Sequence, residues 1–231
     1  GRYRLQAPLG TGGMNEVWLA RDDTLGRDVA IKVLRGAPQG DDDRWMRFER
    51  EAQVASSLTS PHTVKIFDYG ASDDGIAYIA MEFLRGLDLA DLVAGYGPLD
   101  IRRAVHMVRQ ATSSLAEAHE KGLVHRDIKP ANLFALSTGD PPDFVKVLDF
   151  GLVRELTRPL GHDTHEGVTL GTPAYMAPEQ FLGADVTPAS DVYGLGSTLY
   201  YLLTGRPPFD DSGGDAGLWR AHSSHPLVPV S

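Results

Sequence analysis

The chain has 231 residues, of which 42% are apolar, so it is long and apolar enough to bury the core of one large domain or two lobes. Its 31 acidic residues outnumber its 22 basic ones and no basic block occurs, which argues against nucleic-acid binding and against an anionic membrane surface. The absence of Cys excludes disulfides and thiolate metal sites.

The first third of the chain predicts a small antiparallel sheet with one helix. Short segments that alternate apolar and polar side chains, bounded by turn residues, are predicted as strands. These are residues 3–5, 16–20, 28–33, 64–69 and 76–82, the last two joined as a hairpin. The acidic run at 41–43 precedes apolar residues at helical spacing, which predicts a helix over residues 42–58.

From about Leu87 onward the pattern turns helical, with strong helices predicted over residues 100–121 and 188–204. We therefore expect a small β-rich lobe that joins a larger helical lobe near residues 83–86. The longest apolar run, residues 192–203, is interrupted by glycines and is too short to span a bilayer. No charged-then-apolar leader follows Gly1, so no signal peptide is predicted.

A glycine-rich segment, Gly10-Thr11-Gly12-Gly13, joins the first two predicted strands. Glycines let the backbone approach a ligand closely and leave amides free for phosphate oxygens, although an ordinary hairpin turn uses the same residues. No Gly-Lys-Ser/Thr follows, so the segment is not a Walker motif. A phosphate-binding turn and a plain turn both stay open on this segment alone.

A short polar string carries the strongest functional signal. Residues 125–130, His-Arg-Asp-Ile-Lys-Pro, are followed by Asn132 and by residues 149–151, Asp-Phe-Gly. Within about 25 residues these segments supply a base, a cation and two oxygen ligands for a metal, which are the parts that phosphoryl transfer needs. The sequence therefore predicts a phosphoryl-transfer site here.

These strings, together with residues 29–32 (Val-Ala-Ile-Lys) and 171–179 (Gly-Thr-Pro-Ala-Tyr-Met-Ala-Pro-Glu), resemble the eukaryotic-like serine/threonine protein kinases of bacteria. The resemblance implies an α+β, bilobal protein-kinase-like fold. We expect a β-rich N-lobe with one major helix at residues 1–84, and a larger, mainly helical but truncated C-lobe at residues 85–231. The implied activity is transfer of the γ-phosphate of ATP to Ser or Thr hydroxyls of protein substrates, in cytoplasmic signalling.

The resemblance also implies the residues that bind ATP. Lys32 would grip the α- and β-phosphates, and Glu51 would pair with Lys32, because a carboxylate inside the apolar stripe of its helix is costly without a cation. Met81 would guard the back of the adenine pocket, and Asn15 stands where the family has a third glycine. The expected ATP-binding residues are Leu9, Gly10, Thr11, Gly12, Gly13, Met14, Asn15, Val17, Ala30, Lys32, Glu51, Met81, Glu82, Leu84 and Leu133.

Four residues would carry the chemistry. By resemblance, Asp127 accepts or orients the proton of the attacking hydroxyl, and Lys129 neutralises charge on the transferring phosphate. Asn132 and Asp149 are hard oxygen ligands suited to Mg²⁺, or to Mn²⁺ in its place.

Three further residues would have supporting roles by resemblance. His125 and Phe150 are expected to pack in a buried column. Asp191 is expected to brace the catalytic loop from below.

The polar segment that ends at Glu179 resembles an activation loop. Autophosphorylation is expected on Thr169, with Thr164 second, and self-association would accompany it. Arg47, Arg126 and Arg154 would form the phosphate pocket. The histidines and acids at 162–166 could also bind a metal, but a solvated loop is the favoured reading.

Two rival functions stay open. A pseudokinase would bind nucleotide without transfer, and only Asn15 favours it. A small-molecule kinase is the other rival. The Ala-Pro-Glu string and Thr172 argue against it, because they favour a protein substrate. We expect no nucleic-acid partner and no membrane contact from this segment, which leaves open a membrane anchor elsewhere in the full-length protein.

The family continues through two helices that have no counterpart before Ser231. In the family, an arginine from these helices pairs with the residue at the position of Glu179, so Glu179 is expected to lack this partner. A partly buried carboxylate without a partner destabilises the folded state by on the order of 3 kcal/mol or more. We expect the missing helices to come from residues beyond 231 or from another chain.

Overall fold

The computed structural model describes residues 1–12, 15–34, 42–72, 75–137, 142–150, 173–209 and 214–230. These residues form two compact units. The first unit contains Gly1–Thr59 and Val64–Arg85. The second contains residues 60–63, 86–150 and the described residues from 173 onward.

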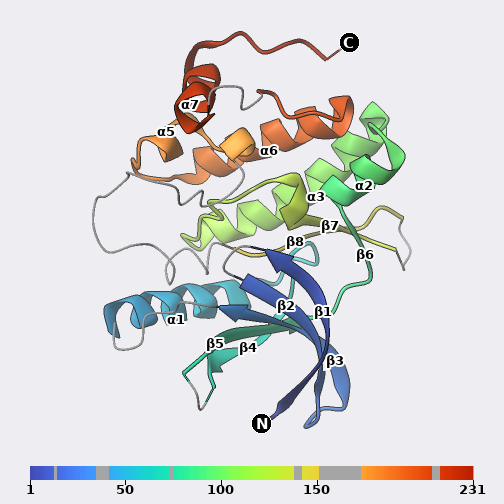
Figure 1. Ribbon diagram of the computed structural model, residues 1–231, viewed down its shortest axis with the longest axis vertical. Helices are drawn as coiled ribbons and strands as arrows, with labels where there is room; N and C mark the ends of the chain where they lie inside the picture. Colours follow the sequence, from blue (N-terminus) through green and yellow to red (C-terminus); the bar gives the residue numbers. More distant parts are fainter. Residues whose placement is uncertain are drawn as a thin grey trace. The chain divides into compact units, whose positions relative to one another are not determined.

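The first unit is an antiparallel sheet with one long helix beside it (Figure 1). The elements are β1 (Tyr3–Gly12), β2 (Asn15–Asp22), β3 (Arg27–Leu34), α1 (Asp42–Ser56), β4 (Ile66–Ala71) and β5 (Ala77–Glu82). The strand order is β1-β2-β3-β5-β4, so β3 is the central strand. Its residues 29–32 are buried without interruption, so both faces of β3 are covered here. The strands and the helix predicted for this region are confirmed.

Apolar packing fixes α1 to the sheet. Phe48, Ala52 and Ala55 are buried, and the Phe48 ring meets the Tyr69 ring of β4 edge to face at 6.1 Å. Edge-to-face contacts of this kind add about 0.5–1.5 kcal/mol beyond the burial of area. The apolar stripe predicted on this helix is therefore the face that it buries.

Asp22 closes the turn between β2 and β3 from a fully buried position. Its carboxylate accepts hydrogen bonds from Arg2 Nε at 3.2 Å and Arg2 Nη2 at 2.9 Å, and from the Thr24 and Leu25 N–H groups at 3.1 Å each. These contacts hold the pKa of the Asp22 carboxyl below its usual value, chiefly through the Arg2 bond. The start of the chain is thus tied to the sheet.

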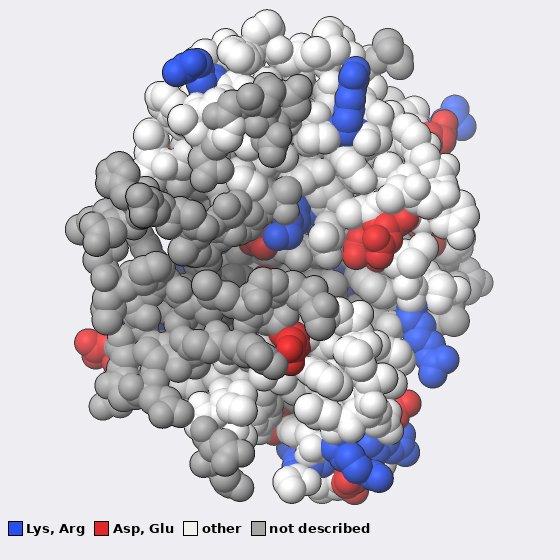
Figure 2. All heavy atoms as spheres, viewed as in Figure 1, with Lys and Arg blue, Asp and Glu red and all other residues white. Residues whose placement is uncertain are grey.

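Two exposed arginines of the first unit are paired with nearby carboxylates. Arg4 lies 2.7 Å from Asp23, and Arg21 lies 2.7 Å from Asp28. Figure 2 shows basic and acidic side chains side by side at its lower edge, over the N-terminal strands. Pairs of this kind contribute at most about 1 kcal/mol each, so they shape the surface charge more than the stability.

The second unit is mainly helical and contains a small sheet (Figure 1). Its helices are α2 (Leu89–Tyr96), α3 (Ile101–Glu120), α5 (Pro178–Phe181), α6 (Pro188–Thr204) and α7 (Gly214–Ser224), with 3₁₀ turns η1 (Pro130–Asn132) and η2 (Pro173–Tyr175). Its strands are β6 (Gly86–Asp88), β7 (Leu133–Leu136) and β8 (Val145–Val147), in the order β6-β7-β8. Helix α3 packs against both α6 and β8. Among the described residues, no helix has the length and apolar character needed to cross a bilayer.

Caps define the long helices of this unit. The Asp100 carboxylate accepts the Arg102 N–H at 2.9 Å and begins α3, and Gly205 ends α6 in the left-handed conformation at φ 74°. The predictions of helices over 100–121 and 188–204 are confirmed. The mainly helical character expected after Leu87 is confirmed, but the small sheet of β6, β7 and β8 was not predicted. Strands of three or four residues are too short to show a period.

Residues 60–63 belong to the second unit, although they connect α1 to β4. The Ser60 N–H donates to Glu117 Oε2 at 2.7 Å, and the Thr63 and Ser114 hydroxyls lie 2.7 Å apart. The Val147 N–H donates to the His62 carbonyl at 2.7 Å. These bonds fix residues 60–63 to α3 and β8.

Candidate active site

Asp191 anchors the loop that carries the candidate catalytic residues. It lies in the first turn of α6 and is 1% exposed. Its carboxylate accepts the N–H groups of His125 and Arg126 at 2.8 Å each, and His119 Nε2 lies 2.7 Å from its Oδ2 atom. A buried carboxylate requires donors of this kind. The expected role of Asp191 as a brace is confirmed.

The His125 ring is fully buried and packs against the Phe150 ring, with ring centroids 4.9 Å apart. Both of its nitrogens are used. Nε2 lies 2.6 Å from the Leu148 carbonyl, and Nδ1 lies 3.3 Å from the Asp127 N–H. Because a carbonyl only accepts and an N–H only donates, Nε2 carries the proton and Nδ1 is the acceptor. The expected packing of His125 and Phe150 is confirmed, and the two hydrogen bonds of the imidazole are additional.

The Asp127 carboxylate is held by two neighbours on the same loop. Lys129 Nζ lies 2.9 Å from Asp127 Oδ2, and Asn132 Nδ2 donates to Asp127 Oδ2 at 2.9 Å and to the Asp127 carbonyl at 2.6 Å. The side chain of Asp127 is 41% exposed, whereas Asn132 is buried. The structure therefore presents an accessible carboxylate in a fixed orientation, which suits a general base.

Backbone pairing brings Asn132 and Asp149 into one region. Leu133 pairs with Val147 in the sheet, and the Leu148 N–H donates to the Asn132 carbonyl at 2.9 Å. Asp149 adopts the left-handed conformation at φ 56°, which is uncommon for a residue other than Gly and is typical of functional sites.

The donor atoms of these two residues suit a hard cation. The amide nitrogen of Asn132 is bonded to Asp127, so its side-chain oxygen is the atom suited to a metal. A carboxylate and an amide oxygen match the ligand preference of Mg²⁺. Mg²⁺ usually keeps water and phosphate ligands in addition to one or two protein ligands. In the part of the chain that the structure describes, no group of three or more His, Cys, Asp or Glu side chains is suited to hold a metal.

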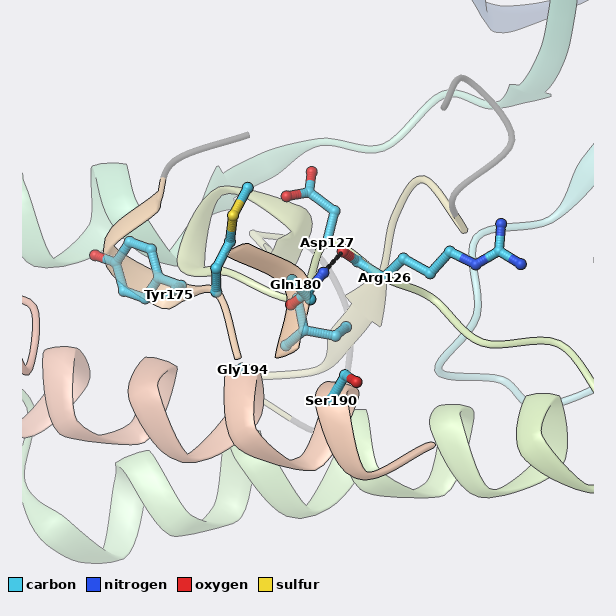
Figure 3. A pocket seen from close by; sticks show the side chains of 8 residues that line it. Arg126, Asp127, Tyr175, Gln180, Ser190 and Gly194 are labelled. Carbon is cyan, nitrogen blue, oxygen red and sulfur yellow. Dashed lines mark hydrogen bonds between the residues drawn. The ribbon is translucent and has the colours of Figure 1, made fainter. Parts of the chain in front are cut away.

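A small pocket opens beside Asp127 (Figure 3). Helix α6 forms its floor and approaches the loop so closely that a Cβ on Gly194 would lie 2.8 Å from the Ile128 carbonyl. Glycine is therefore required at this contact. The pocket is lined by Arg126, Asp127, Ile128, Tyr175, Met176, Gln180, Ser190 and Gly194.

In the first unit, four of the expected ATP-binding residues lie on one face of the sheet. Val17 pairs with Lys32, and Ala30 pairs with Met81. Ala30 and Lys32 are two residues apart on β3, so the cross-strand partners share their face. Lys32 is 6% exposed. Glu51 lies half-buried on α1, and its ion pair with Lys32 stays a prediction.

Glu82 and Leu84 lie at the end of β5 and just beyond it, and both are half-buried. The Glu82 N–H donates to the Lys65 carbonyl at 2.9 Å, and the Glu82 carboxylate accepts the Lys65 N–H at 2.7 Å. The Glu82 N–H is therefore already bonded, and the adenine contacts expected of Glu82 and Leu84 stay a prediction. Leu133 is fully buried at the start of β7 in the second unit.

The strands run into the glycine-rich segment further than predicted. Leu9 is exposed on β1, which continues to Gly12, and Asn15 is the first residue of β2. The pairs Gly10 with Val17, Thr11 with Glu16, and Gly12 with Asn15 close this end of the hairpin. Gly13 and Met14 lie outside the described residues. Cross-strand hydrogen bonding thus extends both predicted strands.

Comparison with known proteins decides the family. The family model described as "Protein kinase domain" matches residues 3–226. The chain belongs to the protein kinase domain family. The resemblance to the serine/threonine protein kinases of bacteria is confirmed by the relatives of this kinase domain.

Two curated relatives and one solved structure illustrate the similarity. Serine/threonine-protein kinase pkn3 of Myxococcus xanthus is 41% identical over 211 residues, which are 90% of this chain and 39% of the relative. Serine/threonine-protein kinase PknB of Mycobacterium tuberculosis is 43% identical over 211 residues, 90% of this chain and 33% of the relative. The chain thus spans about a third of the length of the curated relatives that it matches.

The crystal structure of the PknI kinase domain of M. tuberculosis superposes with a TM-score of 0.72 and 31% identity. The match covers 92% of this chain and 76% of that one. The α+β protein-kinase fold expected from the sequence is confirmed.

The regulatory residues of the kinase domain are described only in part. Thr164, Thr169 and Arg154 lie outside the described residues. Arg47 is exposed on α1, and Arg126 is half-buried with a left-handed backbone at φ 69°. The phosphate pocket expected from these arginines stays a prediction.

Sequence reasoning missed two residues that bond to the candidate catalytic loop or to its anchor, Asp191. His119 meets Asp191 across 72 positions of the sequence, and no local pattern links the two. Gln180 donates to the Arg126 carbonyl at 2.9 Å. Gln180 follows Ala177 by three residues, and Pro178 lies between them, which is a pattern typical of a helix start. This pattern could have predicted the hydrogen bond from the Ala177 N–H to the Gln180 side chain.

Proposed function

We propose that this kinase domain transfers the γ-phosphate of ATP to Ser and Thr hydroxyls of protein substrates. The observation that carries the proposal is the Asp127 carboxylate, which is accessible and is held by Lys129 and Asn132 at 2.9 Å each. The family and the bacterial serine/threonine kinases among its relatives support this activity and a protein substrate.

Asp127 would act on the attacking hydroxyl. The hydroxyl oxygen forms a bond to the γ-phosphorus, the bond from that phosphorus to the β,γ-bridging oxygen breaks, and the hydroxyl proton passes to the Asp127 carboxylate. Lys129, whose ammonium lies beside that carboxylate, would offset negative charge on the transferring group. Asn132 keeps the carboxylate in one orientation during this step.

The proposal assigns the nucleotide contacts to residues of the first unit and the metal contacts to residues of the second. Lys32 would contact the phosphates, and Val17, Ala30, Met81 and the backbone near Glu82 would contact the adenosine. Asn132 and Asp149 would hold Mg²⁺, or Mn²⁺ in its place, through oxygen atoms. The bound cation would supply charge neutralisation on the phosphate oxygens.

Autophosphorylation is part of the proposal. The acceptors would be Thr169 and then Thr164, and Arg47, Arg126 and Arg154 would bind the phosphate. The proposed setting is cytoplasmic signalling, with transient self-association during transfer between two copies.

The decisive experiment is phosphate transfer from radiolabelled ATP to the chain itself and to a generic protein acceptor, with Asp127→Asn as the matched inactive variant. We expect the variant to bind Mg·ATP as the parent does and to lose nearly all transfer. A variant that keeps more than about a tenth of the parental turnover, which in this family is about 1–100 per second, would refute the role of Asp127. Binding of ATP without transfer by the parent would indicate a pseudokinase.

A further inference from the structure

The Gln180 side chain uses both ends of its amide between α5 and the catalytic loop. Its Oε1 atom accepts the Ala177 N–H at 3.0 Å, and its Nε2 atom donates to the Arg126 carbonyl at 2.9 Å. The second bond is drawn in Figure 3, where Gln180 lies below Asp127 in the pocket. Gln180 therefore joins the segment that begins at η2 to the residue just before Asp127.

The carbonyl that Gln180 contacts belongs to the peptide unit that leads directly into Asp127. The N–H of the same unit, that of Asp127, lies 3.3 Å from His125 Nδ1. A peptide unit is planar, so hydrogen bonds at its carbonyl and at its N–H together fix its rotation. A change in ψ of Arg126 that φ of Asp127 does not compensate would displace the Asp127 Cα atom and with it the carboxylate.

The backbone at this point needs such support. Arg126 has φ 69°, and a residue other than Gly keeps this uncommon conformation only where its surroundings hold it there. The Arg126 N–H is bonded to Asp191, and its carbonyl is bonded to Gln180. Residues from α5 and α6 thus fix the left-handed turn from two sides.

We propose that Gln180 is a positioning residue of the kinase domain: it orients the Arg126–Asp127 peptide and couples the placement of residues 173–181 to that of the base. The inference rests on the proposed function, because alignment of Asp127 matters only if Asp127 acts in transfer. The alternative is that Gln180 only caps α5. A Gln or Glu at this position of a helix commonly bonds the N–H at the helix start, and that role needs Oε1 alone.

Two substitutions separate these roles. Gln180→Glu keeps an acceptor for the Ala177 N–H but loses the donor to Arg126 and places a carboxylate oxygen against the carbonyl. Gln180→Met, of similar size, loses both bonds. If Gln180 positions Asp127, Gln180→Glu lowers kcat at least tenfold, as much as Gln180→Met or more, while KM for ATP stays within twofold of the parent.

If Gln180 serves only as a cap, Gln180→Glu keeps the parental kcat, and only Gln180→Met is impaired. That result would overturn the inference. Gln53→Glu is the matched control, because it makes the same chemical change at an exposed position of α1 and is expected to leave kcat unchanged.

A second measurement decides the inference without activity. Amide hydrogen exchange should become at least tenfold faster at Asp127 and its neighbours in Gln180→Glu, and should not change in Gln53→Glu. Unchanged exchange at Asp127 in Gln180→Glu would overturn the inference. If the parent transfers no phosphate, the proposed function fails, and the exchange experiment still tests the role of Gln180.

Discussion

His222 should make the stability of the kinase domain depend on pH. Its ring is 8% exposed and lies against the rings of Phe181, Tyr193 and Phe209, and its Nδ1 atom lies 2.7 Å from the Tyr193 hydroxyl. Its Nε2 atom is buried without a hydrogen-bond partner among the described residues. Burial lowers the pKa of His222 from 6.5 to about 4.

The direction of the effect follows from proton binding. Between pH 6.5 and pH 4 the unfolded chain binds a proton at His222 and the folded chain does not, so stability falls as pH falls through this window. At pH 5 the shift corresponds to a loss of no more than about 2 kcal/mol relative to neutral pH, or about 4–8 °C in Tm for a chain of this size.

Urea denaturation of the parent and of His222→Phe at several pH values, followed by Trp fluorescence, would measure this loss. Trp219 lies on the same helix, α7, and reports on it. The difference in unfolding free energy between parent and variant should change by the stated amount from pH 7 to pH 5. His225→Phe, at an exposed position of the chain, should show no such change. An identical pH dependence in the parent and in His222→Phe would refute the reasoning.

Three further predictions concern the pocket and the nucleotide site. Gly194→Ala should lower the unfolding free energy of the domain by about 1–3 kcal/mol, because the new Cβ would contact a loop carbonyl. Gly196→Ala, on the same helix, places its Cβ in open space and should be neutral or stabilising. Thermal denaturation of both variants would measure the difference. Asp149→Asn should weaken Mg·ATP binding, and calorimetry that shows unchanged affinity at limiting Mg²⁺ would contradict its metal role. Lys32→Met and Glu51→Gln should lower activity non-additively in steady-state assays, since both break one predicted pair, and additive losses would mean that the two side chains do not meet.

The sequence was most informative where local rules act. The helix over 188–204 ends at a glycine in the left-handed conformation. The apolar residues around Phe48 have the spacing of one helix face. The candidate catalytic motif is visible in the sequence because its residues lie within one short loop. Asp127, Lys129 and Asn132 are close in sequence, so their contacts in space require no knowledge of the tertiary fold.

The features that the sequence did not predict depend on distant parts of the chain. Strand β8 is three residues long and becomes a strand only because β7 pairs with it. The contact of His119 with Asp191 joins two helices, and the bond from Gln180 to Arg126 spans 54 positions. Partners of this kind are set by packing between elements, and no periodicity along the chain encodes them.

The membership of residues 60–63 in the second unit bears on how the kinase domain can be divided. A cut at the linker near residues 83–86 would leave Ser60, His62 and Thr63 on the fragment that contains the first sheet. The other fragment would then lose the partners of the Glu117 carboxylate, the Ser114 hydroxyl and the Val147 N–H. The two fragments would be expected to regain a native fold by complementation, as a noncovalent pair, and not each by itself.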